Sequence, residues 1–290
     1  MTILIAVFGL FHPQLLTVRP ATASPVRVVE PAAKELRATA ELRTGMKIEG
    51  DFVLAVPGKI ERRFQGRLDV RQGKGELIAV LEADLERAVA AVVAAEMPAS
   101  FAEEARKAQA IVARSWYIAS RGRHGDFDFC DTTHCQVFKE PATAAYPPLA
   151  IRYRGEAFAP LYSASCGGET KTEADTGMNP DAYPYFRVAC AEHAEAWERR
   201  FHGDDAAAIQ RQPHSERVRL ALGRALGWDA LPSNNYIVAV QSDEIVVKGK
   251  GRGHGLGLCQ QGADAMARQG AMAARIIEHF YPNTRISGMR

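Results

Sequence analysis

One carboxylate, Glu96, stands out because of where the sequence places it. Asp84 is a suitable N-cap, the Ala- and Val-rich run after it predicts a helix from about Leu85 to Glu96, and Pro98 ends that helix. Glu96 therefore lies in the last turn of an almost wholly apolar helix. The negative end of the helix dipole and the low local polarity both disfavour its charged form, so its pKa is expected to be raised. Such a carboxyl group suits a general acid working near neutral pH.

A group of metal-binding residue types follows in the chain. The run Cys130-Asp-Thr-Thr-His134-Cys135 offers two thiols and an imidazole, and His124 lies six residues before it. These four residues predict a structural zinc site. Two alternatives are a short disulfide between Cys130 and Cys135 in an oxidising compartment, and a loop with unpaired thiols. Neighbouring side chains on an extended segment point to opposite faces. Either His134 or Cys135 could therefore be missing from the set of zinc ligands, with a water molecule in its place.

A second predicted helix lies between these two features. Ser100 followed by Glu103 has the pattern of a capping box, apolar residues then recur at helical spacing, and Gly122 is a natural stop. Arg114 lies next to the apolar stripe. Two interpretations stay open: an arginine near Glu96 that holds the substrate, or a solvated surface arginine.

Several ordered motifs together resemble one known family. They are EMP before the second helix, KAQAIVARSW within it, CDTTHCQVF after it, SASCGGET at Ser163–Thr170 and GRGHGLGLCQQGA at Gly251–Ala263. This arrangement resembles the stage II sporulation protein D family (SpoIID/LytB) over about Phe64 to Thr284. The resemblance implies a peptidoglycan lytic transglycosylase in which Glu96 is the acid and base.

The implied reaction cleaves the β-1,4 bond between MurNAc and GlcNAc without water. The C6 hydroxyl of the muramic acid attacks C1 of its own ring and leaves a 1,6-anhydroMurNAc end, so a single carboxylate suffices where ordinary glycosidases use two. No cofactor is needed for this chemistry. Two other classes stay open, a non-catalytic peptidoglycan-binding enhancer of a partner amidase and a zinc hydrolase. Thiol-rich zinc sites are mostly structural, which disfavours the hydrolase.

Candidate substrate-binding residues lie in the motif segments. Small residues and two glycines in Ser163–Gly168 let the backbone approach a ligand, and the serine hydroxyls can bond sugar oxygens. His254 in the glycine loop could bond the substrate or the carboxylate. Cys259 stands where many family members carry serine. The residues predicted to bind substrate are Arg114, Gln136, Ser163, Ser165, His254 and Gln260.

The start of the chain indicates export. Ile3–Phe11 is a short apolar run, and Ala21-Thr22-Ala23 has the form of a cleavage site, which together predict a signal peptide over residues 1–23. Nine residues are too few to span a bilayer, so a cleaved signal is favoured over a membrane anchor. The expected location is periplasmic or cell-wall associated. Five cysteines are an odd number, so at least one thiol stays unpaired or binds metal, and Cys166 and Cys190 are the first candidates for a disulfide.

Composition and patterning set the fold class and the partners. With 290 residues, of which 47% are hydrophobic, the chain can bury a real core. A net charge of +2 without a long basic run argues against nucleic acid, and there is no Walker loop or GxGxxG for a nucleotide. Glycan strands and a cell-wall amidase are the expected partners.

The predicted fold is α+β in one domain over residues 24–290, with N-terminal antiparallel strands, a helical catalytic segment, further short strands and C-terminal helices around a central cleft. Residues 30–43 are ambiguous between a helix and a linker, and a short helix is expected at Trp197–Phe201. Early strands are predicted at Val26–Val29, Met46–Val56, Phe64–Val70 and Glu76–Leu81.

Overall fold

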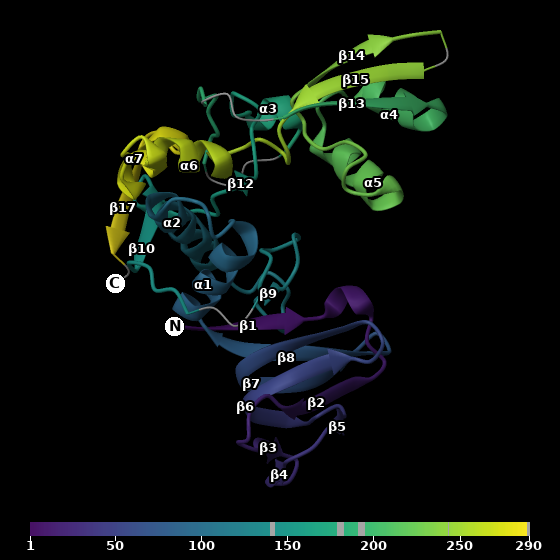
Figure 1. The fold of residues 1–290 in the computed structure, drawn as a ribbon, viewed down its shortest axis with the longest axis vertical. Helices are drawn as coiled ribbons and strands as arrows, with labels where there is room; N and C mark the ends of the chain where they lie inside the picture. The colour runs from purple at the N-terminus through teal and green to yellow at the C-terminus, as the bar shows by residue number, and fades with distance from the viewer. Residues whose placement is uncertain (140–142, 179–182, 191–194, 243, 289–290) are drawn as a thin grey trace. The chain divides into compact units, whose positions relative to one another are not determined.

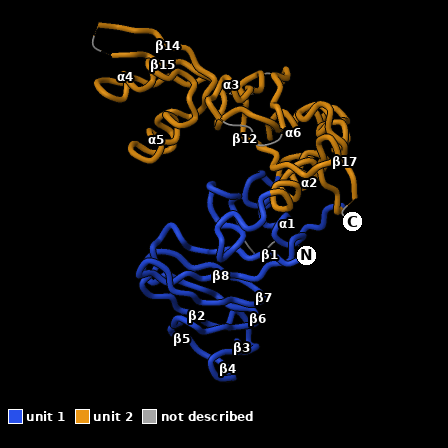
Figure 2. The backbone as a smooth tube through the Cα atoms, turned by 180° about the vertical axis from the view of Figure 1, so that it is seen from behind, with its two compact units in different colours: residues 1–99, 120–147 blue, residues 100–119, 148–290 orange. Residues whose placement is uncertain are grey.

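The chain divides into two compact units. The computed structural model describes residues 1–139, 143–178, 183–190, 195–242 and 244–288. Unit 1 comprises residues 1–99 and 120–147, and unit 2 comprises residues 100–119 and 148–290 (Figure 2). Both units contain helices and strands, which confirms the α+β class. The single domain predicted over residues 24–290 is thus divided between two units, and each is described here by itself.

Unit 1 is built on a nine-stranded sheet (Figure 1). Its main path runs β4-β3-β6-β7-β8-β1-β9, and β2 pairs with β5 and β6 beside it. The strands are β1 (Thr2–Val7), β2 (Leu16–Pro20), β3 (Val26–Glu30), β4 (Lys34–Leu36), β5 (Ala40–Leu42), β6 (Lys47–Val56), β7 (Ile60–Gly73), β8 (Glu76–Asp84) and β9 (Phe129–Cys130), with a 3-10 turn at Gly9–Phe11.

Period-two burial explains the long antiparallel strands of this sheet. In β6 the side chains of Ile48, Phe52 and Leu54 are buried while their neighbours are not, so one face of the strand meets the core. The β7–β8 hairpin turns at Lys74-Gly75, both at positive φ, which is typical of a two-residue hairpin turn. Residues 30–43 are neither helix nor plain linker, because they contain β4 and β5.

Helix α1 (Leu85–Glu96) follows β8 directly and has the predicted bounds. The Asp84 side chain accepts hydrogen bonds from the amides of Glu86 and Arg87, which is the expected N-cap. Seven of its residues from Leu85 to Val93 are buried. A local cap and an apolar run therefore suffice to specify this helix and to place Glu96 at its end.

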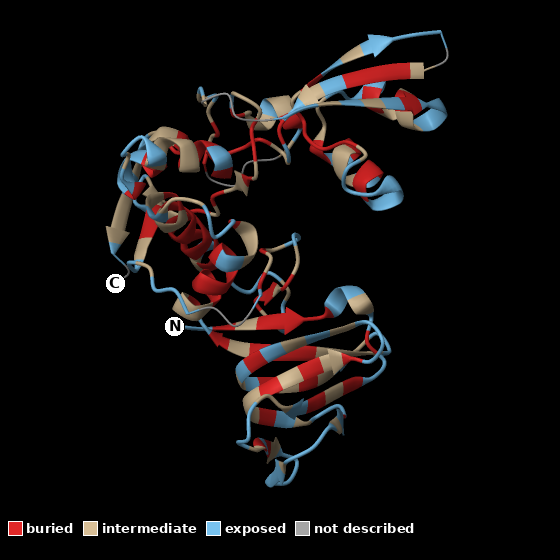
Figure 3. Ribbon diagram, in the orientation of Figure 1, coloured by how far each residue is buried: buried red, intermediate tan, exposed pale blue. Residues whose placement is uncertain are grey.

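Residues 1–23, predicted to be a cleaved signal peptide, contribute two strands to the sheet. Strand β1 pairs antiparallel with β8 and parallel with β9, and Ile3 and Ile5 are fully buried (Figure 3). Removal of these residues would take away the strand that lies between β8 and β9. The fold therefore argues against removal of residues 1–23 by cleavage before Ser24. No helix in the described part of the chain is long and apolar enough to cross a membrane.

The mature protein is accordingly expected to contain β1. Intact-mass and N-terminal peptide mass spectrometry of the protein isolated from its native cells should detect residues 2–23. A mature N-terminus at Ser24 in the folded protein would contradict this expectation and restore the predicted signal peptide.

Unit 2 has helix α2 and three small sheets. Helix α2 (Glu103–Ala119) packs against β10, α6 and α7. The sheets are β11-β10-β17, the parallel pair β12-β16, and β13-β15-β14. The elements besides α2 are β10 (Leu149–Tyr153), β11 (Glu156–Ala157), β12 (Tyr162–Ser163), α3 (Glu173–Thr176), β13 (Ala196–His202), α4 (Gly203–Arg211), α5 (Glu216–Leu226), β14 (Tyr236–Val240), β15 (Glu244–Lys250), β16 (Leu258–Cys259), α6 (Gln260–Arg268), α7 (Ala273–Phe280) and β17 (Thr284–Gly288).

The start of α2 differs from the sequence prediction. The helix begins at Glu103, so Ser100 lies outside it and the capping box predicted from Ser100 and Glu103 is wrong. Instead, the amide of Ala102 donates to Asp264 Oδ1 at 2.6 Å. A tertiary contact from α6 therefore holds the first turn of α2.

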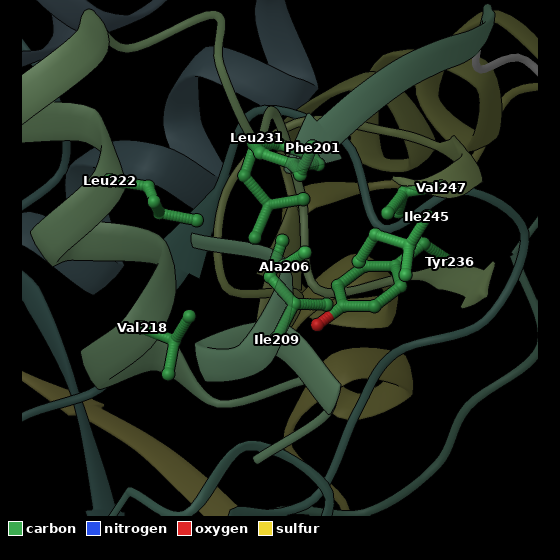
Figure 4. Packing of buried hydrophobic residues seen from close by; sticks show 9 residues of the cluster. All are labelled: Phe201, Ala206, Ile209, Val218, Leu222, Leu231, Tyr236, Ile245 and Val247. Carbon is green, nitrogen blue, oxygen red and sulfur yellow. The ribbon is translucent and has the colours of Figure 1, made fainter. Parts of the chain in front are cut away.

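The short helix predicted at Trp197–Phe201 is also wrong. These residues form β13, which pairs with β15 from Ala196 to His202. Its inward-facing Phe201 joins a core of nine buried residues from β13, β14, β15, α4, α5 and the turn at Leu231 (Figure 4). The composition of this segment favours a helix, but pairing with β15 makes it a strand.

Candidate functional site

The carboxylate of Glu96 is held by the segment that follows the Cys/His loop. Glu96 is half-buried, and its Oε1 accepts a hydrogen bond from the backbone N–H of Val137 at 3.1 Å. Both residues belong to unit 1. Val137 lies two residues after Cys135. The conformation of the Cys/His loop therefore affects the direction of this N–H group. The expected rise in the Glu96 pKa stays a prediction.

All four predicted metal ligands converge at one place. One ligand atom from each of His124, Cys130, His134 and Cys135 lies within 4.8 Å of all the others. The two sulfurs are 3.3 Å apart, and His124 Nε2 is 3.2 Å from the Cys135 sulfur. The His134 Nδ1 atom lies 3.7 Å from the Cys130 sulfur and 3.8 Å from the Cys135 sulfur.

These separations are within about 0.5 Å of the edges of a tetrahedral zinc site, with the two sulfurs closer together than in a metal-bound site. Metal–sulfur bonds of about 2.3 Å and metal–nitrogen bonds of about 2.0 Å place neighbouring ligand atoms roughly 3.3–3.8 Å apart. The sulfurs are free thiols in the structure and too far apart for a disulfide. The donor set therefore fits Zn²⁺, with His124, Cys130, His134 and Cys135 as its ligands.

The adjacent pair His134 and Cys135 converges because this segment is a turn. The Cys135 amide donates to the Thr132 carbonyl at 2.9 Å, and the strand before it ends at Cys130. The alternation of side chains that applies to an extended chain does not apply here. Both side chains therefore reach the cluster, and which of them would bind a metal stays a prediction.

The two thiols lie within hydrogen-bond distance of each other, and each affects the pKa of the other. The hydrogen bond from Cys135 is the largest effect that lowers the pKa of Cys130, to about 4, and the same pairing raises the pKa of Cys135. A cation would take the place of the hydrogen-bonded proton between the two sulfurs.

Two aspartates anchor the Cys/His loop to β1. Asp128 Oδ2 accepts from the Leu4 amide at 2.8 Å, and Asp131 Oδ2 accepts from the Phe8 amide at 3.2 Å and from Arg62 at 3.1 Å. Burial raises the pKa of Asp131, while the Phe8 amide and Arg62 oppose that rise. Sequence patterns do not reveal these contacts, because Leu4 and Phe8 are more than a hundred residues away in the chain and Arg62 is 69 residues away.

Arg114 belongs to α2 in unit 2 and is fully buried. Its guanidinium donates to the carbonyls of Leu149 at 2.9 Å and Ala110 at 3.3 Å. The solvated interpretation is therefore wrong, and the contacts connect α2 to β10. A role toward the substrate or Glu96 stays a prediction.

Arg114→Lys is expected to lower the free energy of unfolding by about 1–3 kcal/mol, because one ammonium group replaces a fork of buried donors. Chemical denaturation of the full chain measures this loss. The control is Arg275→Lys, since Arg275 is exposed and pairs only with Glu278 among the contacts described. Equal stability of the two variants would contradict the structural role of Arg114.

Gln136 precedes Val137 in unit 1 and is buried, at 1% exposure. Gln260 in unit 2 is also buried, and its Nε2 donates to Gln109 Oε1 at 3.3 Å. This bond couples α2 to the first turn of α6. Gln109 belongs to no recognisable sequence motif, so it could not be selected from the sequence. In the structure it contacts Gln260, a residue predicted to bind substrate. Substrate contact by Gln136 and Gln260 stays a prediction.

Ser163 is the last residue of β12 and pairs with Cys259 of β16, and Ser165 lies two residues further along the chain in unit 2. Both are buried, and neither hydroxyl has a hydrogen-bond partner among the described residues. Ser165 forms an isolated bridge with Arg252 in the glycine loop. The two segments that carry the predicted substrate-binding serines and His254 therefore lie side by side.

His254 is a neutral residue within this glycine loop. Burial lowers its pKa to about 4, against the effect of Glu216. Its Nδ1 accepts from the Leu256 amide at 3.0 Å, so one ring nitrogen holds the loop in shape. Its predicted contact with substrate or carboxylate stays a prediction.

The pair expected to form a disulfide is joined by a third thiol. Cys166 and Cys190 are free thiols in the structure, and their sulfurs lie within 4.8 Å of each other and of Cys259. The disulfide prediction is therefore corrected to a group of three thiols. Cys259, whose role the sequence left open, completes that group.

Fold and site together define an α+β protein with a single glutamate beside a Cys/His loop. The profile of the stage II sporulation protein family (SpoIID) matches residues 73–157, which cover β8, α1, α2, the Cys/His loop and β10. Over these residues the chain is similar to the SpoIID family.

Three curated relatives are similar over most of the chain. The stage II sporulation protein D of Bacillus subtilis is 26% identical over 265 residues, covering 70% of this chain and 74% of the relative. The protein of the same name from Bacillus amyloliquefaciens is 26% identical over 262 residues, with the same shares. An uncharacterized protein of Brachyspira hyodysenteriae is 26% identical over 253 residues, covering 71% of this chain and 67% of its own length.

Proposed function

We propose that the chain is a peptidoglycan lytic transglycosylase with Glu96 as its acid and base. The observation that carries the proposal is the half-buried carboxylate of Glu96, held by the Val137 amide at the end of an apolar helix. The substrate is the β-1,4 bond between MurNAc and GlcNAc in glycan strands. Work on this substrate requires a location outside the cytoplasm, in the periplasm or at the cell wall.

The reaction needs two proton transfers at one carboxyl group. Glu96 gives its proton to the glycosidic oxygen as the bond from that oxygen to C1 of MurNAc breaks, which releases the GlcNAc hydroxyl. The C6 hydroxyl of the same MurNAc then bonds to C1, and its proton returns to Glu96. The product is a 1,6-anhydroMurNAc end, and no water is consumed. The Val137 amide orients the carboxylate through both steps.

We further propose that His124, Cys130, His134 and Cys135 hold a structural zinc ion. The support is the convergence of two thiols and two imidazoles, whose ligand atoms all lie within 4.8 Å of one another. Zinc bound there would supply rigidity to the loop that leads to Val137. The chain's own residues perform the proton transfers.

Purified chain mixed with sacculi tests the proposal. One sample of sacculi is intact, and a second is treated first with an amidase that removes the stem peptides. Mass spectrometry of the soluble fragments should find new anhydro ends in at least one sample. Chain that binds both samples without releasing fragments, yet accelerates the amidase, would instead support the non-catalytic enhancer.

A further inference from the structure

We infer that Cys166, Cys190 and Cys259 form a second metal site, for a thiophilic ion such as Zn²⁺. The three sulfurs lie within 4.8 Å of one another in unit 2. Sulfurs bound to one tetrahedral zinc ion are separated by roughly 3.8 Å. The site is distinct from the Cys/His loop, which belongs to unit 1. The inference does not depend on the proposed lytic activity.

The three thiols come from three separate segments of the fold. Cys166 follows β12, Cys190 lies between α3 and β13, and Cys259 ends β16 at the N-cap of α6. The backbone also joins these segments, since the Cys190 amide donates to the Gly168 carbonyl at 2.9 Å. A bound ion would therefore cross-link parts of the chain nearly a hundred residues apart. This is the usual task of a structural thiolate site.

The Cys259 sulfur lies at a position that offers hydrogen-bond donors. Its sulfur accepts backbone N–H bonds from Cys166 and from Gly262, each at 3.3 Å. It also lies at the N-terminal end of α6, where the helix dipole stabilises negative charge. Cys259 is fully buried and Cys166 is 1% exposed. Three thiolates in such a place need a compensating cation, and a divalent ion supplies it.

The number of thiols argues for a metal over a disulfide. A Cys166–Cys190 disulfide would leave Cys259 as a buried thiol beside it, whereas a metal ion uses all three sulfurs. Cys190 is half-buried, so solvent reaches the group on that side. Water or an added small ligand would complete the fourth position.

Gly262 supplies the space for this arrangement. A Cβ atom added there would overlap the Cys190 sulfur and would lie 3.1 Å from the Phe280 ring. Alanine normally stabilises a helix relative to glycine, and Gly262 lies within α6. The glycine at this position therefore fits the close approach of a sulfur atom to the helix.

Metal analysis of protein made in a reducing cytosol with added zinc tests the inference. Protein purified without chelator should hold about two zinc ions per chain by elemental analysis. Cys259→Ser should hold about one, because serine still caps α6 but is a poor zinc ligand. Gly262→Ala should lose the same ion. The double variant Cys130→Ser/Cys135→Ser should also hold about one, at the three-thiol site.

Cobalt distinguishes the two sites when zinc content alone does not. Co²⁺ added to the zinc-free Cys130→Ser/Cys135→Ser variant should give thiolate-to-cobalt charge-transfer absorption at one equivalent. Adding Cys259→Ser to that variant should abolish the absorption. Unchanged zinc in both Cys259→Ser and Gly262→Ala would overturn the inference. A Cys166–Cys190 disulfide found by non-reducing peptide mapping of the zinc-loaded protein would overturn it too.

Discussion

Glu96→Gln is expected to abolish the formation of anhydro ends. Glutamine keeps the size of the side chain and can still accept from the Val137 amide, but it has no proton to give and retrieve. General acid and base catalysis contributes about 10²- to 10⁴-fold, so the rate of glycan cleavage should fall by at least the lower figure. Release of anhydro fragments from sacculi, followed by mass spectrometry, measures the loss. Co-sedimentation with sacculi should remain as for the wild type.

The matched control is Glu86→Gln, the same chemical change in the first turn of α1. It should keep cleavage within a few-fold of the wild type. Undiminished anhydro ends from Glu96→Gln would remove Glu96 from the reaction. Equal loss in both variants would mean that α1 tolerates neither change, and the assignment to Glu96 would fail as well.

Cys135→Ala is expected to release the zinc ion of the Cys/His loop and to lower cleavage by about 10- to 100-fold. Cys135 contacts every other ligand residue of the cluster, and its loss removes one of only two thiolates and weakens the site. The loop leads to Val137, whose amide orients Glu96. Elemental analysis and the rate of anhydro-end release measure the two effects. Hydrogen exchange over residues 120–137 should rise together with the loss of metal.

The control in the same loop is Thr133→Ala, an exposed position that supplies no ligand. It should keep both zinc and activity. Full zinc content in Cys135→Ala would exclude the proposed ligand set. Full cleavage by a zinc-free Cys135→Ala protein would show instead that the loop does not serve Glu96.

Local signals predicted some elements well. The bounds of α1 follow from the Asp84 cap, the apolar run and Pro98, all of which act within a few residues. The turn at Lys74-Gly75 is equally local. The four ligands of the Cys/His loop could also be named, because their residue types are rare and closely spaced.

Features that depend on distant partners were predicted poorly. The apolar run in β1 has the composition of a signal peptide, and only its pairing with β8 and β9 shows that it belongs to the sheet. Residues 196–202 favour a helix by composition, yet β15 makes them a strand. Tertiary packing likewise produces the contact of Asp264 with the start of α2. It also places Cys259 next to Cys166.

Cleavage in water enriched in ¹⁸O tests the central claim most directly. A transglycosylase closes the C6 hydroxyl onto C1, so the new glycan ends should be anhydro ends without ¹⁸O. A hydrolase, including one that uses the Cys/His loop, adds an oxygen from water to C1. Mass spectrometry of the ends released by the wild-type chain, with Glu96→Gln as the blank, separates the two. Anhydro ends that carry no label are predicted, and labelled reducing ends would contradict the account.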